Sequence, residues 1–161
     1  MRIVHLVALL MMGVLMSGFS TTAQAAGAAL SSQARAILDK SSGFRSVATF
    51  KELPAAIQES LGDMADPGDK WTVDCSGEEG VPHKRLIWAM TDGADTLVYY
   101  ESGGRVYLRL VLIATVDPVT HKAIRVWHGR ADPKTAPIEN TADVMRALSA
   151  GQLVHIVEKQ Q

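Results

Sequence analysis

The sequence contains a single cysteine, Cys75, which excludes disulfide-rich scaffold proteins because one thiol cannot close a bridge within the chain. Aromatic residues make up only 6% of the sequence. Neither sign of charge dominates, since 16 Lys and Arg stand against 17 Asp and Glu, for a formal net charge of -1. Nucleic-acid binding is therefore not predicted, because it usually requires a basic face or arm.

The sequence also lacks an apolar run long enough to span a membrane, because a membrane-spanning helix needs about 20 apolar residues. The apolar run at residues 6–16 is shorter, follows Arg2, and precedes the small-x-small sequence Ala23-Gln24-Ala25. This order is typical of a secretory signal peptide. We therefore predict that residues 1–25 are a signal peptide cleaved near Ala25. The mature chain, residues 26–161, is then a single periplasmic or secreted domain with no stable membrane span.

Sequence motifs for common catalytic and metal sites are missing as well. Gly-x-Ser-x-Gly and Gly-x-x-x-x-Gly-Lys are both absent. The potential metal ligands do not have the close spacing of a zinc site; they are His83, His121, His128, His155 and Cys75. Asp63, Asp66 and Asp69 surround a Pro-Gly turn but do not match the EF-hand spacing. We predict no metal and no cofactor.

Helical patterns are found toward both ends of the mature chain. Leu53, Ile57 and Leu61 share one side of a helix predicted at residues 53–61, with Pro54 in its first turn. A second short helix is expected after a cap at Ser31 or Ser32, and a third after a cap at Asn140 or Thr141. Residues 26–50 are otherwise expected to be loosely ordered.

Between Trp71 and Arg130 the apolar residues alternate with a period of two, which predicts strands. The predicted strands span residues 71–75, 84–91, 96–101, 105–117 and 123–130, and residues 154–157 could add an edge strand. Tight turns such as Asp92-Gly93 and Gly103-Gly104 favour antiparallel pairing of successive strands. The predicted fold is α+β: a meander of about five strands, with N- and C-terminal helices on one face and the other face open to solvent.

The predicted open face would carry aromatic and arginine side chains, which are common at binding surfaces. The candidate binding residues are Arg85, Tyr100, Tyr107, Arg109, Arg125 and Trp127. This patch favours a non-enzymatic binding or accessory module, for instance an inhibitor or partner of an envelope enzyme. Such a module predicts a flat patch without a deep pocket.

Two alternatives remain open. A small thiol hydrolase would use Cys75 with His83 or His128, but alternation with Trp71 and Val73 predicts a buried, structural thiol. A carrier of an apolar ligand would need an enclosed apolar cavity of at least roughly 300 Å³ between the sheet and its helices. No catalytic residue is assigned.

Several short segments between residues 50 and 112 resemble a set of small exported bacterial proteins of unknown function. The segments are Phe50-Lys51-Glu52-Leu53-Pro54, Met64-Ala65-Asp66-Pro67-Gly68, Arg85-Leu86-Ile87-Trp88 and Tyr100-Glu101-Ser102-Gly103-Gly104. They consist of turn and strand residues. The resemblance implies export from a bacterial cell and assigns no functional residue.

Overall fold

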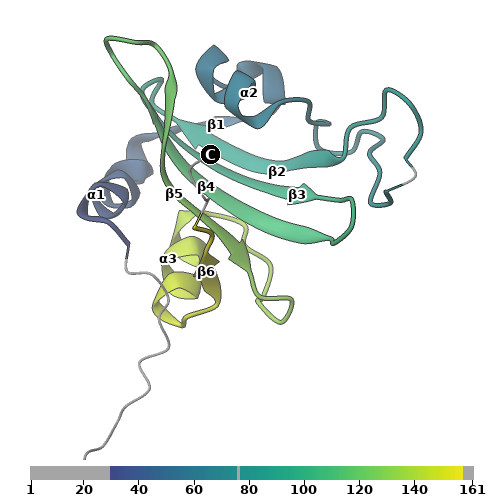
Figure 1. Ribbon diagram of the computed structural model, residues 1–161. Helices are drawn as coiled ribbons and strands as arrows, with labels where there is room; N and C mark the ends of the chain where they lie inside the picture. The colour runs from purple at the N-terminus through teal and green to yellow at the C-terminus, as the bar shows by residue number, and fades with distance from the viewer. Residues whose placement is uncertain (1–29, 76, 158–161) are drawn as a thin grey trace, which may run out of the picture.

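A six-stranded antiparallel sheet forms the centre of the protein in a computed structural model that describes residues 30–75 and 77–157 (Figure 1). The strands lie side by side in chain order, as a meander. They are β1 (Arg45–Val47), β2 (Lys84–Thr91), β3 (Asp95–Ser102), β4 (Leu108–Val116), β5 (Ala123–Ala131) and β6 (Leu153–His155). The α+β class and the antiparallel sheet are confirmed. The strand not expected from the sequence is β1, whose three residues are too few to show alternation.

Among the described residues, three α-helices and two 3₁₀ turns accompany the sheet. They are α1 (Ser32–Lys40), η1 (Ser41–Gly43), η2 (Phe50–Glu52), α2 (Ala55–Leu61) and α3 (Thr141–Ser149). The side chain of Ser31 caps α1 by accepting a hydrogen bond from the Ala34 N–H, and Asn140 caps α3 in the same way. Gly62 ends α2 at a positive φ of 67°, a backbone conformation that favours glycine.

The helices bury both faces of the sheet. The first and last helices, α1 and α3, cover one face, where Ile37 and Val144 belong to one apolar cluster with Ile113. The opposite face packs against α2, where Ile57 meets Leu112 (Figure 1). The face expected to be open to solvent is therefore largely covered. Residues 110–114 are all buried and point alternately to the two faces, so this strand needs cover on both sides.

The strand predicted at residues 71–75 is not formed. This segment is an extended loop held beside the β3–β4 turn, because the Gly104 N–H donates to the Val73 carbonyl at 2.8 Å. Cys75 is exposed there, so the prediction of a buried thiol is wrong. Alternation over only three apolar residues does not distinguish a strand from an extended loop.

Two register shifts determine which side chains share a face. In β2 the shift lies between Leu86 and Trp88, and Ile87 is the extra residue. In β5, Trp127 lies opposite Ile113 while Arg125 lies opposite Ala114, so the intervening residue has no partner. A bulge of this kind reverses the alternation of side chains beyond it.

The predicted signal peptide, residues 1–25, lies outside the described residues. Within the described part of the chain, no helix has the length and apolar character needed to cross a bilayer.

Candidate ligand-binding cavity

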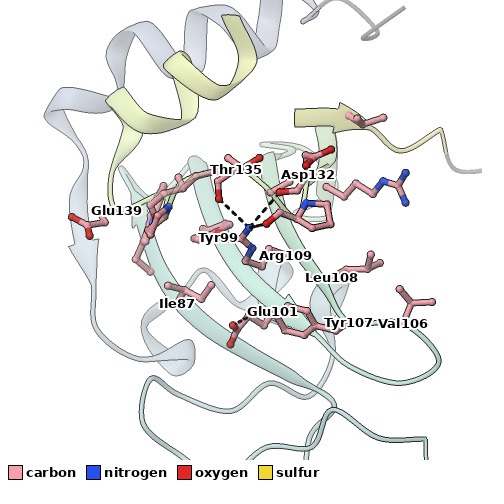
Figure 2. A pocket seen from close by; sticks show the side chains of 17 residues that line it. Ile87, Tyr99, Glu101, Val106, Tyr107, Leu108, Arg109, Asp132, Thr135 and Glu139 are labelled. Atoms are coloured by element: carbon pink, nitrogen blue, oxygen red, sulfur yellow. Dashed lines mark hydrogen bonds between the residues drawn. The ribbon is translucent and has the colours of Figure 1, made fainter. Parts of the chain in front are cut away.

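A cavity of about 1040 Å³ opens where β5 separates from β4. Pairing between these strands ends at Leu110 opposite Arg130, and residues 132–140 then lead away from the sheet toward α3. Ile87, Tyr99 and Arg109 contribute to the floor from β2, β3 and β4, and residues 132–139 form a wall (Figure 2). The cavity is open to solvent on one side.

The cavity continues around the end of the sheet, since its lining comes from both faces. Tyr99 belongs to the cluster beneath α1 and α3, whereas Leu108 packs against the cluster beneath α2. Arg130 and Val154 are directly paired on β5 and β6 and also line it. The cavity therefore lies where lining residues from the two faces meet at the end of the sheet.

Apolar side chains make up much of the lining. Ile138 is buried in the wall, and Ile87 lies on the floor. Val106 and Tyr107 form an exposed apolar rim, with 63% and 46% of their surfaces accessible. Exposed apolar side chains that adjoin a cavity are typical of binding sites.

Glu101 is the buried carboxylate of the floor, and its oxygens are already engaged. Arg85 donates to Oε2 through Nε at 2.8 Å and Nη2 at 2.5 Å. The Tyr107 hydroxyl donates to Oε1 at 2.5 Å (Figure 2). Burial, followed by the hydrogen bond and charge of Glu101, raises the pKa of Tyr107 to about 12. Tyr107 is therefore a protonated donor at neutral pH and is unsuited to act as a base.

Arg109 connects the floor of the cavity to its wall through hydrogen bonds. Its Nη2 donates to the backbone carbonyls of Asp132 and Pro133 at 3.3 Å and of Thr135 at 3.1 Å (Figure 2). Burial raises the pKa of the neighbouring Tyr99 hydroxyl, and the Arg109 charge opposes that rise. Trp88 makes a second hydrogen bond to the wall, because its Nε1 donates to the Ile138 carbonyl at 2.7 Å.

The six predicted binding residues are divided between the two faces. Tyr107 and Arg109 line the cavity, and Arg85 lies beside them through its contact with Glu101. Trp127 shares their face but is 3% exposed, within the core beneath α1 and α3. Tyr100 is buried on the α2 face, and Arg125 bonds there to the Ser60 carbonyl of α2. The six residues therefore do not form one surface.

The division has two physical causes. The shift in β5 turns Arg125 and Trp127 to opposite faces, although they are two residues apart. The β3–β4 register pairs Glu101 with Arg109, so Tyr99 rather than Tyr100 lies on the Arg109 face.

Sequence reasoning missed Glu101, Tyr99 and the wall at residues 132–139. Glu101 carried a signal, because a charged residue that ends a run of buried strand residues needs a partner. The wall at residues 132–139 had no local sequence signal, since its contacts with Arg109 join residues up to 26 positions apart.

Cys75 does not form a catalytic pair in the described part of the chain. Its thiol is free and exposed, and it makes no hydrogen bond to a described histidine. No group of three or more His, Cys, Asp or Glu side chains that could hold a metal ion occurs within residues 30–75 and 77–157.

Comparisons with protein-family models, with curated proteins and with solved structures found no match. The candidate site is therefore argued from its own geometry.

Proposed function

We propose that this protein binds a small, largely apolar organic ligand in the cavity at the end of the sheet. The observation that carries the proposal is the cavity of about 1040 Å³. Ligand sites typically have volumes of about 300–1,000 Å³ and combine an apolar lining with a few polar groups. Of the functions considered from the sequence, the carrier requires a cavity, whereas a flat docking module does not. The carrier was expected to have an enclosed cavity between the sheet and its helices, and this cavity instead lies at the end of the sheet and is open to solvent.

The polar groups of the cavity favour binding without catalysis. The Glu101 oxygens accept hydrogen bonds from Arg85 and Tyr107, so Glu101 has little capacity left to act on a substrate. The pKa of Tyr107, about 12, is far above neutral pH, where a general base is most effective. The exposed Cys75 lies in the loop after residue 70 and does not line the cavity.

Titration with the neutral apolar fluorophore N-phenyl-1-naphthylamine tests the proposal. The wild-type protein should enhance its fluorescence saturably, with one site per chain. Val106→Asp places a hydrated carboxylate on the rim and should weaken binding about tenfold, equivalent to about 1.4 kcal/mol. Val119→Asp is the matched control, because Val119 is 84% exposed in the β4–β5 turn, outside the cavity lining.

Two outcomes would contradict the proposal. One is the absence of saturable fluorescence enhancement with the wild-type protein. The other is an equal loss of affinity in the Val106 and Val119 variants, which would locate the bound fluorophore elsewhere. Thermal unfolding of both variants checks that a loss of binding does not reflect a loss of folded protein.

We further propose that the ligand is bound outside the cytoplasm, after removal of residues 1–25. The supporting observation is the sequence of Arg2, the apolar run and Ala23-Gln24-Ala25. Protein recovered from the envelope or medium of a bacterial host should begin at Ala26. Protein that keeps Met1 and stays in the cytoplasmic fraction would contradict export.

A further inference from the structure

We infer that the ligand of the cavity is an amphipathic monocarboxylate whose carboxylate binds the Arg109 guanidinium. This inference rests on the proposed function and specifies the chemical class of the ligand. Three observations carry it: the pairing of Glu101, the geometry of the Arg109 hydrogen bonds, and the distribution of the remaining charges.

The first observation is that Arg109 has no acidic partner among the described residues. Glu101 and Arg109 lie directly opposite each other on β3 and β4, a position that commonly gives a cross-strand ion pair. The Glu101 carboxylate instead pairs with Arg85. Its other oxygen accepts the hydrogen bond from Tyr107. The Arg109 side chain therefore brings a positive charge to the cavity without a neutralising carboxylate.

The second observation concerns the bonds that Arg109 does make. One nitrogen, Nη2, carries two hydrogens but faces three carbonyl oxygens, at 3.1–3.3 Å. These distances exceed the 2.7–2.9 Å typical of a hydrogen bond from a charged donor to a carboxylate. A carboxylate can accept two parallel N–H bonds from a guanidinium, and such bonds are about twice as strong as neutral ones. A ligand carboxylate can therefore replace the wall carbonyls on Arg109.

The third observation is that the cavity suits a single negative charge on the ligand. Asp132 and Glu139 also line the cavity, and both belong to the wall. The Asp132 carboxylate accepts the Lys134 N–H at 2.8 Å through Oδ1. These two acids disfavour a ligand with several negative charges. Arg130 lines the cavity from the end of β5 and makes no ion pair with a described residue.

The remainder of the ligand must be apolar to match the other lining side chains. Ile87 and Leu108 lie on either side of Arg109 in the close-up, with Val106 beyond Leu108 (Figure 2). An apolar chain or ring attached to the carboxylate would contact them when the carboxylate is on Arg109. Medium-chain fatty acids and aromatic carboxylic acids have this composition.

A competition experiment tests the inference by comparing decanoate with 1-decanol, which has the same chain without the charge. Each compound displaces N-phenyl-1-naphthylamine from the wild-type protein at neutral pH, below its micelle-forming concentration. We expect decanoate to bind at least about ten times more tightly than decanol. This comparison needs no variant and therefore does not depend on the folding of one.

Variants assign the preference to Arg109. Arg109→Gln should make the two affinities equal, and Arg109→Lys should keep part of the difference, because lysine retains the charge but not the two-pronged geometry. Arg105→Gln is the matched control, because Arg105 is exposed in the β3–β4 turn and does not line the cavity, and it should leave the preference for decanoate intact. Arg130→Gln tests the other arginine of the cavity lining. Binding of the neutral fluorophore by each variant confirms that its cavity is formed.

The outcomes separate this inference from the proposed function. If the wild-type protein binds the fluorophore but binds decanol as tightly as decanoate, the carboxylate inference is overturned and the proposed function stands. If the preference disappears in Arg130→Gln and persists in Arg109→Gln, the assignment to Arg109 is overturned. If the fluorophore does not bind the wild-type protein, the proposed function fails and the inference fails with it.

Discussion

Tyr107 and Glu101 illustrate how single residues set the chemistry of the cavity. Tyr107 is half-exposed at the rim, yet its hydroxyl donates to a carboxylate in the floor. That donation requires a protonated phenol, so ionisation of Tyr107 would place two negative charges next to each other. Ionisation of the Tyr107 phenol therefore makes this contact sensitive to alkaline pH.

The raised Tyr107 pKa predicts a loss of stability at alkaline pH. Between about pH 10, where a tyrosine of the unfolded chain ionises, and about pH 12, the folded protein keeps a proton that the unfolded chain releases. The free energy of unfolding therefore decreases as the pH rises through this interval. Tyr107→Phe should show a smaller decrease in urea unfolding curves measured across it. Equal decreases in both proteins would contradict the prediction.

The exposed position of Cys75 predicts a thiol that reacts in the folded state. Ellman's reagent should modify one thiol per chain without denaturant. Cys75→Ser should bind N-phenyl-1-naphthylamine with unchanged affinity, because Cys75 does not line the cavity. A reaction that begins only in denaturant would show that the loop covers the sulfur. A loss of binding in the serine variant would instead give the thiol a part in the site.

At the scale of elements, the face of the sheet that α2 covers is the main feature that the sequence pattern did not predict. Its apolar stripe was predicted from Leu53, Ile57 and Leu61, and all three are buried. The pattern defines which side of the helix is apolar but not which face of the sheet it covers. That choice depends on the chain between α1 and β2, which carries α2 to the side opposite α1.

Truncation of Ile57, a buried residue of α2, should lower the free energy of unfolding substantially. Ile57 is fully buried, so Ile57→Ala should lower the free energy of unfolding by about 2–5 kcal/mol. The same substitution at Ile124, which is 44% exposed on β5, should cost less than about 1 kcal/mol. Urea unfolding measures both values. A small effect at Ile57 would mean that α2 contributes little to covering its face.

The register shifts in β2 and β5 are a second feature of the elements that the sequence pattern did not predict. Strand positions on β2 and β5 were predicted closely: residues 84–91 match β2, and residues 123–130 lack only the last residue of β5. Side-chain direction was not predictable beyond each register shift, because one extra residue reverses the alternation. No glycine or proline marks the shift at Val126. For this reason Arg125 and Trp127 were expected on one surface and lie on opposite faces.

At the scale of the whole molecule, one sheet serves two apolar clusters. Val111 and Leu112 are adjacent residues of β4, yet each belongs to a different cluster. Loss of packing on one face therefore weakens the strands that support the other face. The cavity lies at the end of this shared sheet, where the β4–β5 pairing stops.

The shared sheet predicts a single cooperative unfolding transition. Ile57→Ala acts on the α2 face, whereas Trp88 and Trp127 report on the face beneath α1 and α3. In this variant, the tryptophan fluorescence and far-ultraviolet circular dichroism transitions should shift together to lower urea. A dichroism change that precedes the fluorescence change would show that the two clusters unfold separately.

The sequence alone determined where most strands and helices form. Alternation, tight turns and capping residues are local, so they can be recognised within a few neighbouring positions. The tertiary structure decided the direction of side chains beyond the bulges, the side of the sheet that α2 covers, and the exposure of Cys75. It also created the candidate site, because Glu101, Arg109 and residues 132–139 meet only through strand pairing and long-range contacts. Such contacts depend on register and on the path of the chain, which no local pattern specifies.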